Sequence, residues 1–325
     1  MQDRFGREIN YLRISVTDRC NFRCFYCMPP DGINSILPSS EILAYEEILE
    51  IVKTSIDSGI TRFRITGGEP LVRKDVISLL QRMIGLPGIE SVSLTTNGYL
   101  LDEFADSLIE IGLDSINIGL NSFDEDNFKA ITGIDGLEKV RNGIRHLLES
   151  GFGNLKINTV VLNDYNTEEV AEIARLTLEH PVAVRFIEYM PCGNWETNSD
   201  SIVKGDEIMR RITGELGGLI RIEDKLGSGP AQYYQLKNAR GKIGFITPVS
   251  RPFCADCNRL RLTADGHLKS CLLSEEEIDL KPILREIRDE RIKMTELNEA
   301  LKNAILAKPE RHLSKRENVM SRIGG

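Results

Sequence analysis

Short apolar runs and longer amphipathic runs alternate over the first two thirds of the chain. The apolar runs are rich in β-branched residues, as strands are, and span residues 12–16, 63–66, 92–96, 115–120, 155–162 and 182–189. The amphipathic runs have apolar residues at helical spacing and span residues 41–56, 76–84, 104–111, 137–148 and 168–178. This alternation of about six βα units predicts a parallel sheet with right-handed crossovers.

The pattern changes after residue 190. A helix is predicted over residues 204–213, a Gly-punctuated strand region over 217–249 and a charged helix over 284–307. We therefore predict a first unit of residues 1–215 and a C-terminal region of residues 216–325. The alternation alone leaves two architectures open, which are a doubly wound sheet and a TIM-type barrel two units short of closure.

Composition and charge restrict the class of protein. The chain has 325 residues, of which 41% are hydrophobic and 28% charged, an ordinary globular mixture. Its net charge of −8 argues against a general nucleic-acid or acidic-membrane surface. The first residues are not apolar, and no apolar run is long enough to span a bilayer. We therefore expect a soluble cytoplasmic protein.

The seven cysteines are clustered rather than spread along the chain. Three lie within residues 20–27 and three within residues 254–271, whereas Cys192 stands apart and has no predicted role. An odd number, tight clustering and no export signal argue against a disulfide framework. Two groups of three thiols indicate two metal sites.

The first cysteine group directly follows the first predicted strand. Cys20, Cys24 and Cys27 have the spacing C-x3-C-x2-C. A cubane [4Fe–4S] cluster normally takes four thiolates, so three leave one iron open to bind a ligand. The alternative is zinc, but zinc needs four ligands and no histidine is near in the sequence.

This spacing, with the aromatic Tyr26 just before the last cysteine, resembles the signature of the radical S-adenosylmethionine superfamily. The resemblance implies a (β/α)6 barrel, an incomplete TIM-type α/β fold whose open side the C-terminal region covers. It also implies that the open iron chelates S-adenosylmethionine. Reductive cleavage then releases methionine and a 5′-deoxyadenosyl radical. Tyr26 is expected to contact this cofactor.

The loop after the second strand contains Gly67, Gly68 and Glu69 in the sequence TGGEP. A glycine pair lets the backbone approach a ligand closely, and a carboxylate accepts a hydrogen bond from an ammonium group. A plain turn is the alternative. In this position the loop resembles the superfamily motif for the methionine amino group.

Other strand ends carry candidate ligand contacts. By resemblance Thr95 contacts a ligand, which we assign to the substrate. The resemblance also implies that Asn117 and Gly119 contact S-adenosylmethionine. Met190 is expected to pack on the adenine of that cofactor, with ordinary core packing as the alternative. The family usually has a hydroxyl residue where this chain has Gly119 and an acidic one where it has Asn121. All these positions lie at the carboxyl ends of strands, where α/β folds place active sites.

Three strands carry basic residues on one face. Arg13, Arg64 and Lys156 each alternate with apolar residues. In a barrel the outer face packs on helices, so these cations are expected to point inward. Burying them without partners is costly, which leaves internal ion pairs, water or an anionic ligand. A polyanion such as a nucleoside triphosphate fits best.

The second cysteine group is Cys254, Cys257 and Cys271, with spacing C-x2-C-x13-C. Spacing alone leaves zinc open, because His267 lies between the last two cysteines. The run C-x2-C-x-R-x-R on this type of barrel resembles the auxiliary [4Fe–4S] site of the GTP 3′,8-cyclase family. There an open iron binds the guanine of GTP.

The resemblance to that family also assigns substrate contacts and a catalytic tail. The expected substrate-binding residues are Arg13, Arg64, Thr95, Lys156, Asn258, Arg259, Leu260 and Arg261. The expected catalytic residues are Arg322, Gly324 and Gly325, because the family's C-terminal Gly-Gly reaches into the active site.

The resemblance implies the first step of molybdenum cofactor biosynthesis. The 5′-deoxyadenosyl radical takes the 3′ hydrogen of GTP, and the C3′ radical attacks C8 to give 3′,8-cyclo-7,8-dihydro-GTP. The implied partners are GTP, a reductant and a downstream cyclic pyranopterin monophosphate synthase. The oligomeric state stays open, with a homodimer as one candidate.

Two other functions remain as alternatives. One is a radical S-adenosylmethionine enzyme that modifies a peptide, and the other is a non-catalytic iron–sulfur or zinc protein. The first gives no role to Arg259, Arg261 or the C-terminal glycines, and the second predicts neither the TGGEP loop nor inward cations.

Overall fold

The structure is a computed structural model that describes residues 1–28, 36–191, 202–223, 226–312 and 323. Cys192, Arg322, Gly324 and Gly325 lie outside the described residues.

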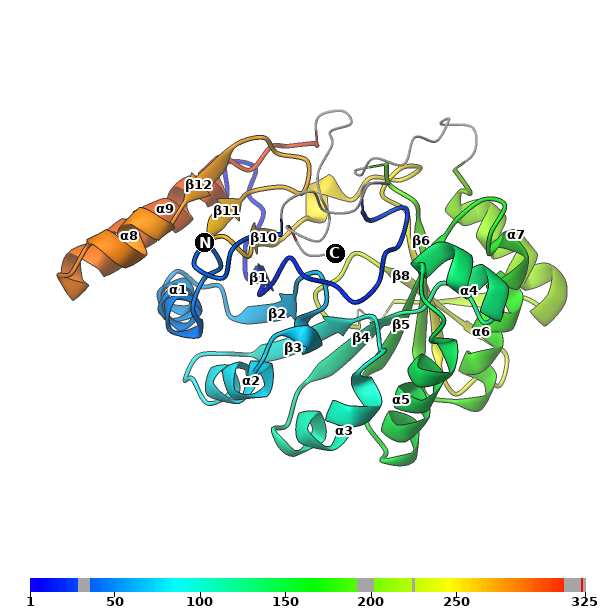
Figure 1. Cartoon of the computed structure of the whole chain (residues 1–325). Coiled ribbons are helices and arrows are strands. Elements are labelled where there is room, and N and C mark those ends of the chain that lie inside the picture. Colours follow the sequence, from blue (N-terminus) through cyan, green and yellow to red (C-terminus); the bar gives the residue numbers. More distant parts are fainter. Residues whose placement is uncertain (29–35, 192–201, 224–225, 313–322, 324–325) are drawn as a thin grey trace.

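Six parallel strands follow one another in chain order through the sheet (Figure 1). They are β1 (Tyr11–Ser15), β2 (Arg62–Thr66), β3 (Ser91–Thr96), β4 (Ser115–Gly119), β5 (Leu155–Val161) and β6 (Ala183–Glu188). Each corresponds to a strand predicted from the sequence, so that part of the prediction is confirmed. Unbroken sequential order with crossover helices is the arrangement of a TIM-type barrel and not of a doubly wound sheet.

Helices connect these strands along the outside of the curved sheet (Figure 1). They are α1 (Tyr45–Asp57), α2 (Val76–Ile84), α3 (Leu101–Glu110), α5 (Leu137–Glu149) and α6 (Val170–Glu179). The sequence pattern missed α4 (Glu125–Thr132), which is short. Its start is capped by Asp124, whose side chain accepts a hydrogen bond from the Asn127 N–H, and it ends at Gly133 in the left-handed conformation.

The C-terminal strands join the same sheet at both of its edges. They are β7 (Leu219–Ile222), β8 (Gln232–Leu236), β9 (Lys242–Ile246), β10 (Arg259–Leu262), β11 (His267–Lys269) and β12 (Glu277–Asp279). Strand β10 pairs in parallel with β1, and β9 pairs in parallel with β6. Antiparallel β11–β12 and β8–β7 then complete the two edges, so the barrel stays incomplete. The division at residue 215 stays a prediction.

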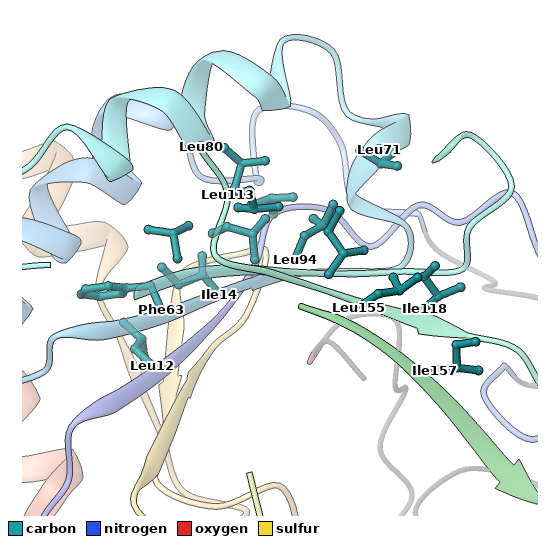
Figure 2. Packing of buried hydrophobic residues seen from close by; sticks show 14 of the residues in the cluster. Leu12, Ile14, Phe63, Leu71, Leu80, Leu94, Leu113, Ile118, Leu155 and Ile157 are labelled. Carbon is teal, nitrogen blue, oxygen red and sulfur yellow. The ribbon is translucent and has the colours of Figure 1, made fainter. Parts of the chain in front are cut away.

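The hydrophobic core lies between the outer face of the strands and the helices. Figure 2 shows Leu12 and Ile14 of β1, Phe63 of β2 and Leu94 of β3 directed toward this layer. All four side chains are fully buried. Burial of such a side chain stabilises the fold by about 1.5–3 kcal/mol. Because alternate residues face opposite sides, this arrangement directs the polar set inward.

The remaining helices are α7 (Gly205–Leu216), α8 (Lys281–Glu286) and α9 (Glu290–Leu306). Helix α9 packs against α1, and a hydrogen bond of 3.1 Å joins Ser58 Oγ to Asn298 Oδ1. In the part of the chain that the structure describes, no helix has the length and apolar character needed to cross a membrane.

Candidate active site

The loop of the first cysteine triad, Cys20, Cys24 and Cys27, is held by the Gly67–Gly68 turn. The Gly68 N–H donates to Thr17 O at 2.7 Å, and the Glu69 N–H donates to Arg19 O at 2.8 Å. A Cβ atom on Gly67 would lie 2.7 Å from Thr17 O, and one on Gly68 would overlap the Arg19 carbonyl. Both glycines are therefore required for the close approach of two backbone segments.

The Glu69 carboxylate joins the Gly67–Gly68 turn to the end of β3. It is fully buried and accepts hydrogen bonds from Thr96 Oγ1 at 2.8 Å, the Asn97 N–H at 2.6 Å and the Leu71 N–H at 3.1 Å. Burial outweighs these bonds and raises the pKa of Glu69 to about 7. Gly67 and Gly68 line the central cavity, whereas the Glu69 side chain is not among the lining groups. Its contact with an ammonium group stays a prediction.

One cavity of about 390 Å³ opens at the carboxyl ends of the strands. Both cysteine triads line it, so the barrel brings together two groups that are more than 200 residues apart in sequence. All six of these cysteines are half-buried free thiols. The cavity is therefore a single site with thiols contributed from two directions.

The predicted cofactor side of the cavity contains Tyr26, Gly119 and Met190. Asn121 Nδ2 donates to Tyr26 Oη at 2.8 Å, and Asn121 Oδ1 accepts from the Val160 N–H at 2.9 Å. Asn121 thus joins Tyr26 to β5. A Cβ on Gly119 would meet nothing closer than Thr96 O at 3.9 Å, so packing does not require glycine there.

Two further predicted residues differ in their surroundings. Thr95 lines the cavity, and its buried Oγ1 has no hydrogen-bond partner in the described structure. Asn117 is fully buried and does not line the cavity. Its Nδ2 donates to Leu94 O at 3.0 Å, and its Oδ1 accepts a short hydrogen bond from Arg185. Thr95 is therefore available to a ligand, whereas Asn117 orients a neighbouring cation.

The inward cations predicted from strand alternation are at the centre of the barrel. Arg64 and Lys156 are buried, and Arg13 is half-buried. Among the described residues, none of the three forms an ion pair with a carboxylate, so internal ion pairs do not account for them. Burial, with Arg185 and Arg64 nearby, lowers the pKa of Lys156 to about 7. Burial likewise lowers the pKa of Arg13 to about 10.

Sequence reasoning missed Arg185, the fourth inward cation. It is buried on β6, lines the cavity and donates from Nε to Asn158 Oδ1 at 2.8 Å. The alternation argument that identified the other cations would have found it, since Val184 and Phe186 on either side belong to the core.

The second cysteine triad spans a 3-10 turn at Cys254–Asp256 and the segment after β11. Arg259 and Arg261 line the cavity, and the Arg259 guanidinium lies 5.2 Å from the centre of the Phe253 ring. Two neighbours point elsewhere. Leu260 is in the core, and Asn258 Nδ2 donates to Asn10 Oδ1 at 2.9 Å.

Lys308 and His312, which carry no sequence signal, complete the surroundings of the second triad. Lys308 Nζ donates to Arg259 O and Ser270 O, both at 2.8 Å, and His312 Nδ1 lies 3.0 Å from Cys254 Sγ. His267, the histidine of the zinc alternative, lies 3.4 Å from Asp265 and does not line the cavity.

One thiol of the second triad, Cys257, differs in acidity from Cys20 and Cys24 of the first triad. Burial raises the pKa of Cys20 to about 11 and that of Cys24 to about 12. Burial also opposes the charged form of Cys257, but Arg259 and Lys308 outweigh it and lower the pKa of that thiol to about 6.

Comparison with known proteins agrees with this site. A family model described as Radical SAM superfamily matches residues 14–177, and one described as Molybdenum Cofactor Synthesis C matches residues 182–314. SuiB of Streptococcus suis, solved with its precursor peptide SuiA, has a similar fold with a TM-score of 0.58 at 14% identity, covering 94% of this chain and 72% of SuiB. The fold and the site thus define a radical S-adenosylmethionine enzyme.

Two curated relatives narrow the assignment. The GTP 3′,8-cyclase of Thermodesulfovibrio yellowstonii is 46% identical over 91% of this chain and 94% of its own length. The GTP 3′,8-cyclase of Pelotomaculum thermopropionicum is 45% identical over 100% of both chains. The chain belongs to the GTP 3′,8-cyclase family.

Membership of the superfamily implies a [4Fe–4S] cluster and S-adenosylmethionine, and the residues present fit both groups. Cys20, Cys24 and Cys27 are free thiols at the cavity wall, with the spacing that leaves one iron open. Gly67, Gly68, Gly119 and Met190 line the same cavity, and a Cβ on Gly119 would meet nothing closer than Thr96 O at 3.9 Å, so the cavity wall leaves room for an organic ligand.

Proposed function

We propose that this chain converts GTP to (8S)-3′,8-cyclo-7,8-dihydroguanosine 5′-triphosphate, the first step of molybdenum cofactor biosynthesis. One observation carries the proposal. Arg13, Arg64, Lys156 and Arg185 point into the barrel and form no ion pair with a carboxylate among the described residues, and three of them, Arg13, Arg64 and Arg185, line the cavity that both cysteine triads also line. Full-length relatives with this activity support the choice of substrate.

The first triad and its surroundings form the cofactor half of the site. Cys20, Cys24 and Cys27 hold a [4Fe–4S] cluster, which when loaded supplies the electron for reductive cleavage of S-adenosylmethionine to a 5′-deoxyadenosyl radical. Gly67 and Gly68 fix the cysteine loop and leave room at the cavity wall. The hydroxyl of Tyr26, held by Asn121, and the thioether of Met190 position the adenosyl group and exclude water.

The second triad and the cations form the substrate half of the site. Cys254, Cys257 and Cys271 hold a second [4Fe–4S] cluster with an open iron for guanine. Arg259 and Arg261 line the cavity beside it, and guanidinium groups match phosphate oxygens in bidentate geometry. With Arg13, Arg64, Lys156 and Arg185 they compensate the charge of the triphosphate, and the Thr95 hydroxyl is a further substrate contact.

Several finer assignments belong to this proposal. Arg322, Gly324 and Gly325 act in catalysis from the C-terminal tail. A cellular reductant supplies the electrons, and cyclic pyranopterin monophosphate synthase consumes the product. Residues 1–215 and 216–325 act as the barrel and the auxiliary-cluster region of a cytoplasmic enzyme.

Anaerobic turnover tests the substrate assignment. The reconstituted protein is incubated with reductant, S-adenosylmethionine and either GTP, ATP or no nucleotide, and 5′-deoxyadenosine is quantified. The proposal predicts formation well above background with GTP alone. Equal formation in all three reactions would refute the assignment.

Metal analysis tests the non-catalytic alternative. Two cubane clusters predict about eight irons and eight acid-labile sulfides per chain, with no zinc. Zinc at the second triad would contradict the proposed second cluster and the binding of guanine to its open iron. The similarity to SuiB does not support the peptide-modifying alternative, because at 14% identity it shows a shared fold and says nothing about the substrate.

A further inference from the structure

The imidazole of His312 lies against the second cysteine triad, on the segment that follows α9. Its Nδ1 is 3.0 Å from Cys254 Sγ, and the residue lines the cavity. Within the described ranges it is the one histidine at the cavity wall, since His267 lies beside Asp265 instead. The contact therefore brings one nitrogen donor to one thiol of this triad.

A single guanidinium fixes the imidazole and the thiol relative to each other. Arg7 Nη1 donates to Cys254 O at 2.7 Å, and Arg7 Nη2 donates to Pro309 O at 2.8 Å, three residues before His312. The fully buried carboxylate of Asp3 holds this guanidinium in turn, at 2.6 Å. Because Arg7 binds the backbone on both sides of the contact, the imidazole is oriented toward the sulfur in advance.

The direction of the hydrogen bond follows from the chemistry of an iron ligand. A cysteine that binds iron is a thiolate and has no proton to donate, so the hydrogen must be on Nδ1 of His312. The imidazole N–H then donates to Cys254 Sγ. Reduction of a cluster adds one electron and no proton, and a donor at the sulfur stabilises the added negative charge. Hydrogen bonds to the sulfurs are accordingly among the factors that set the reduction potential of a cluster.

The first triad has weaker contacts of this kind. Cys20 Sγ accepts from the Phe22 N–H at 3.4 Å, and Asn97 Nδ2 lies 3.8 Å from the same sulfur. Both distances are longer than the 3.0 Å contact at Cys254. The first triad is therefore an internal reference for an effect that is specific to His312.

We propose that His312 donates an N–H···S hydrogen bond to Cys254 and thereby raises the reduction potential of the cluster at the second triad. The inference rests on the proposed function, which assigns a [4Fe–4S] cluster to that triad. His312 acts through Cys254, so it is a positioning residue and not a ligand of the iron. With this bond, one electron from an external reductant is held at the substrate side of the cavity more readily than the three cysteines alone would allow.

A matched pair of variants tests the hydrogen bond. His312→Asn keeps an N–H donor where Nδ1 was, because both nitrogens are bonded to Cγ, whereas His312→Leu has a similar shape and no donor. Anaerobic dithionite titration of the reconstituted holoenzyme, followed by electron paramagnetic resonance, measures the potentials of both clusters. Cys24→Ala, which lacks a ligand of the first cluster, assigns the two signals. The control is His180→Leu, since that ring is partly exposed and does not line the cavity.

The proposal predicts that His312→Leu shifts the reduction equilibrium of the second cluster about tenfold toward the oxidised form, as expected for loss of one hydrogen bond to a charged group. For a one-electron couple this is a potential about 59 mV more negative. His312→Asn should recover most of the shift, and the first cluster and the control should not change. A parent-like potential in His312→Leu, or equal shifts in both variants, would overturn the proposal.

A measurement on the unmodified chain decides the case in which a variant does not fold or load its cluster. The parent is prepared with isotopically labelled histidine nitrogen, reduced with dithionite and studied by electron–nuclear double resonance. A weak nitrogen coupling to the second cluster is expected from an imidazole that is hydrogen-bonded to a ligand. The strong coupling of an imidazole bound to iron, or no coupling at all, would overturn the proposal.

The same samples separate this inference from the proposed function. Zinc or no metal at the second triad would refute the proposed cluster and the role of His312 together. A loaded second cluster whose potential does not respond to His312→Leu would overturn the role of His312 alone. If the potential shifts as expected but GTP gives no 5′-deoxyadenosine above background, the proposed substrate fails and the role of His312 stands.

Discussion

The two cysteine triads share one cavity, but the pKa of Cys257 in the second is shifted in the opposite direction to those of Cys20 and Cys24 in the first. At the first triad, burial is the dominant influence and holds the thiol pKa of Cys20 and Cys24 at about 11 and 12. At the second, Arg259 and Lys308 lower that of Cys257 to about 6 despite burial. Cys20 and Cys24 therefore depend on iron to draw off their protons, whereas Arg259 and Lys308 compensate the charge of the Cys257 thiolate before any metal binds.

The two triads also differ in how the chain assembles them. The first lies on one short loop braced by its neighbour, the Gly67–Gly68 turn. The second is assembled from distant segments. Arg7 Nη1 donates to Cys254 O at 2.7 Å, Arg7 Nη2 donates to Pro309 O at 2.8 Å, and Arg7 pairs with Asp3 at 2.6 Å. The first site therefore depends on local backbone geometry, whereas the second depends on long-range contacts between cations and backbone carbonyl groups.

The largest effect is expected from Gly68→Ala. The added Cβ would overlap the backbone of Arg19, which cannot move without displacing the first cysteine loop. We expect loss of the first cluster and of all 5′-deoxyadenosine formation, with the second cluster retained. Iron analysis and electron paramagnetic resonance check this, with Gly153→Ala as control because its Cβ would meet nothing within 4 Å. A Gly68→Ala protein with both clusters would contradict the bracing role.

Thiol alkylation in the cluster-free protein compares the triads directly. The thiolate is the reactive form, so Cys257 should react with iodoacetamide from about pH 6 upward, and Cys20 and Cys24 only at strongly alkaline pH. At pH 7 the thiolate fractions of Cys257 and Cys20 differ by roughly four orders of magnitude, and the lower nucleophilicity of the more acidic thiol reduces the expected rate difference to on the order of a hundredfold. Peptide mass spectrometry over a pH series measures it. Equal alkylation rates for Cys257, Cys20 and Cys24 would show that their surroundings do not make these thiols differ in acidity.

Lys308→Met should affect only the second triad. It leaves Arg259 O and Ser270 O without their donor and removes a cation beside Cys257. We expect iron to fall from about eight to about four per chain, with the first cluster still able to bind S-adenosylmethionine. Lys302→Met on α9 is the control, since that side chain is half exposed. Full iron content in Lys308→Met would show that the cation does not support the site.

The smallest effect concerns Lys156, an inward cation near the amino-terminal end of β5. The pKa of Lys156 is about 7 in the folded chain and 10.5 in its ordinary state, so between these values the unfolded chain binds more protons. The free energy of unfolding of the nucleotide-free protein should therefore rise with pH over this window, by an amount on the order of a few kcal/mol.

Lys156→Met should flatten this rise, be more stable than the parent at pH 7 and lose stabilisation by GTP. Anaerobic denaturant titrations at pH 7 and pH 10 measure the change. A pH dependence identical to that of the parent would contradict a free buried cation at this position.

The sequence predicted local features well and long-range ones poorly. All six barrel strands and the inward direction of Arg13, Arg64 and Lys156 follow from residue alternation, a local property. The TGGEP motif identified the loop but not the direction of the Glu69 carboxylate, which three hydrogen bonds from β3 and its own turn determine. A sequence motif identifies the residues of a loop, but it does not determine which groups their side chains contact.

The edges of the sheet and the second triad's surroundings could not be predicted. Strands β9 and β10 are short, and they pair in parallel with β6 and β1. This pairing depends on how distant segments of the chain come together, which the local sequence pattern does not show. Lys308 follows the end of α9 and looks like a surface lysine in the sequence, yet it is buried beside Cys257. Such residues acquire their role only when distant segments meet.

The most direct test of the account is transfer of a labelled hydrogen from substrate to cofactor. The holoenzyme is incubated anaerobically with reductant, S-adenosylmethionine and GTP that carries deuterium at the ribose 3′ position. Mass spectrometry then measures deuterium in the 5′-deoxyadenosine. The account predicts one deuterium per 5′-deoxyadenosine with this substrate and none with unlabelled GTP. Formation of unlabelled 5′-deoxyadenosine from the labelled substrate would contradict it.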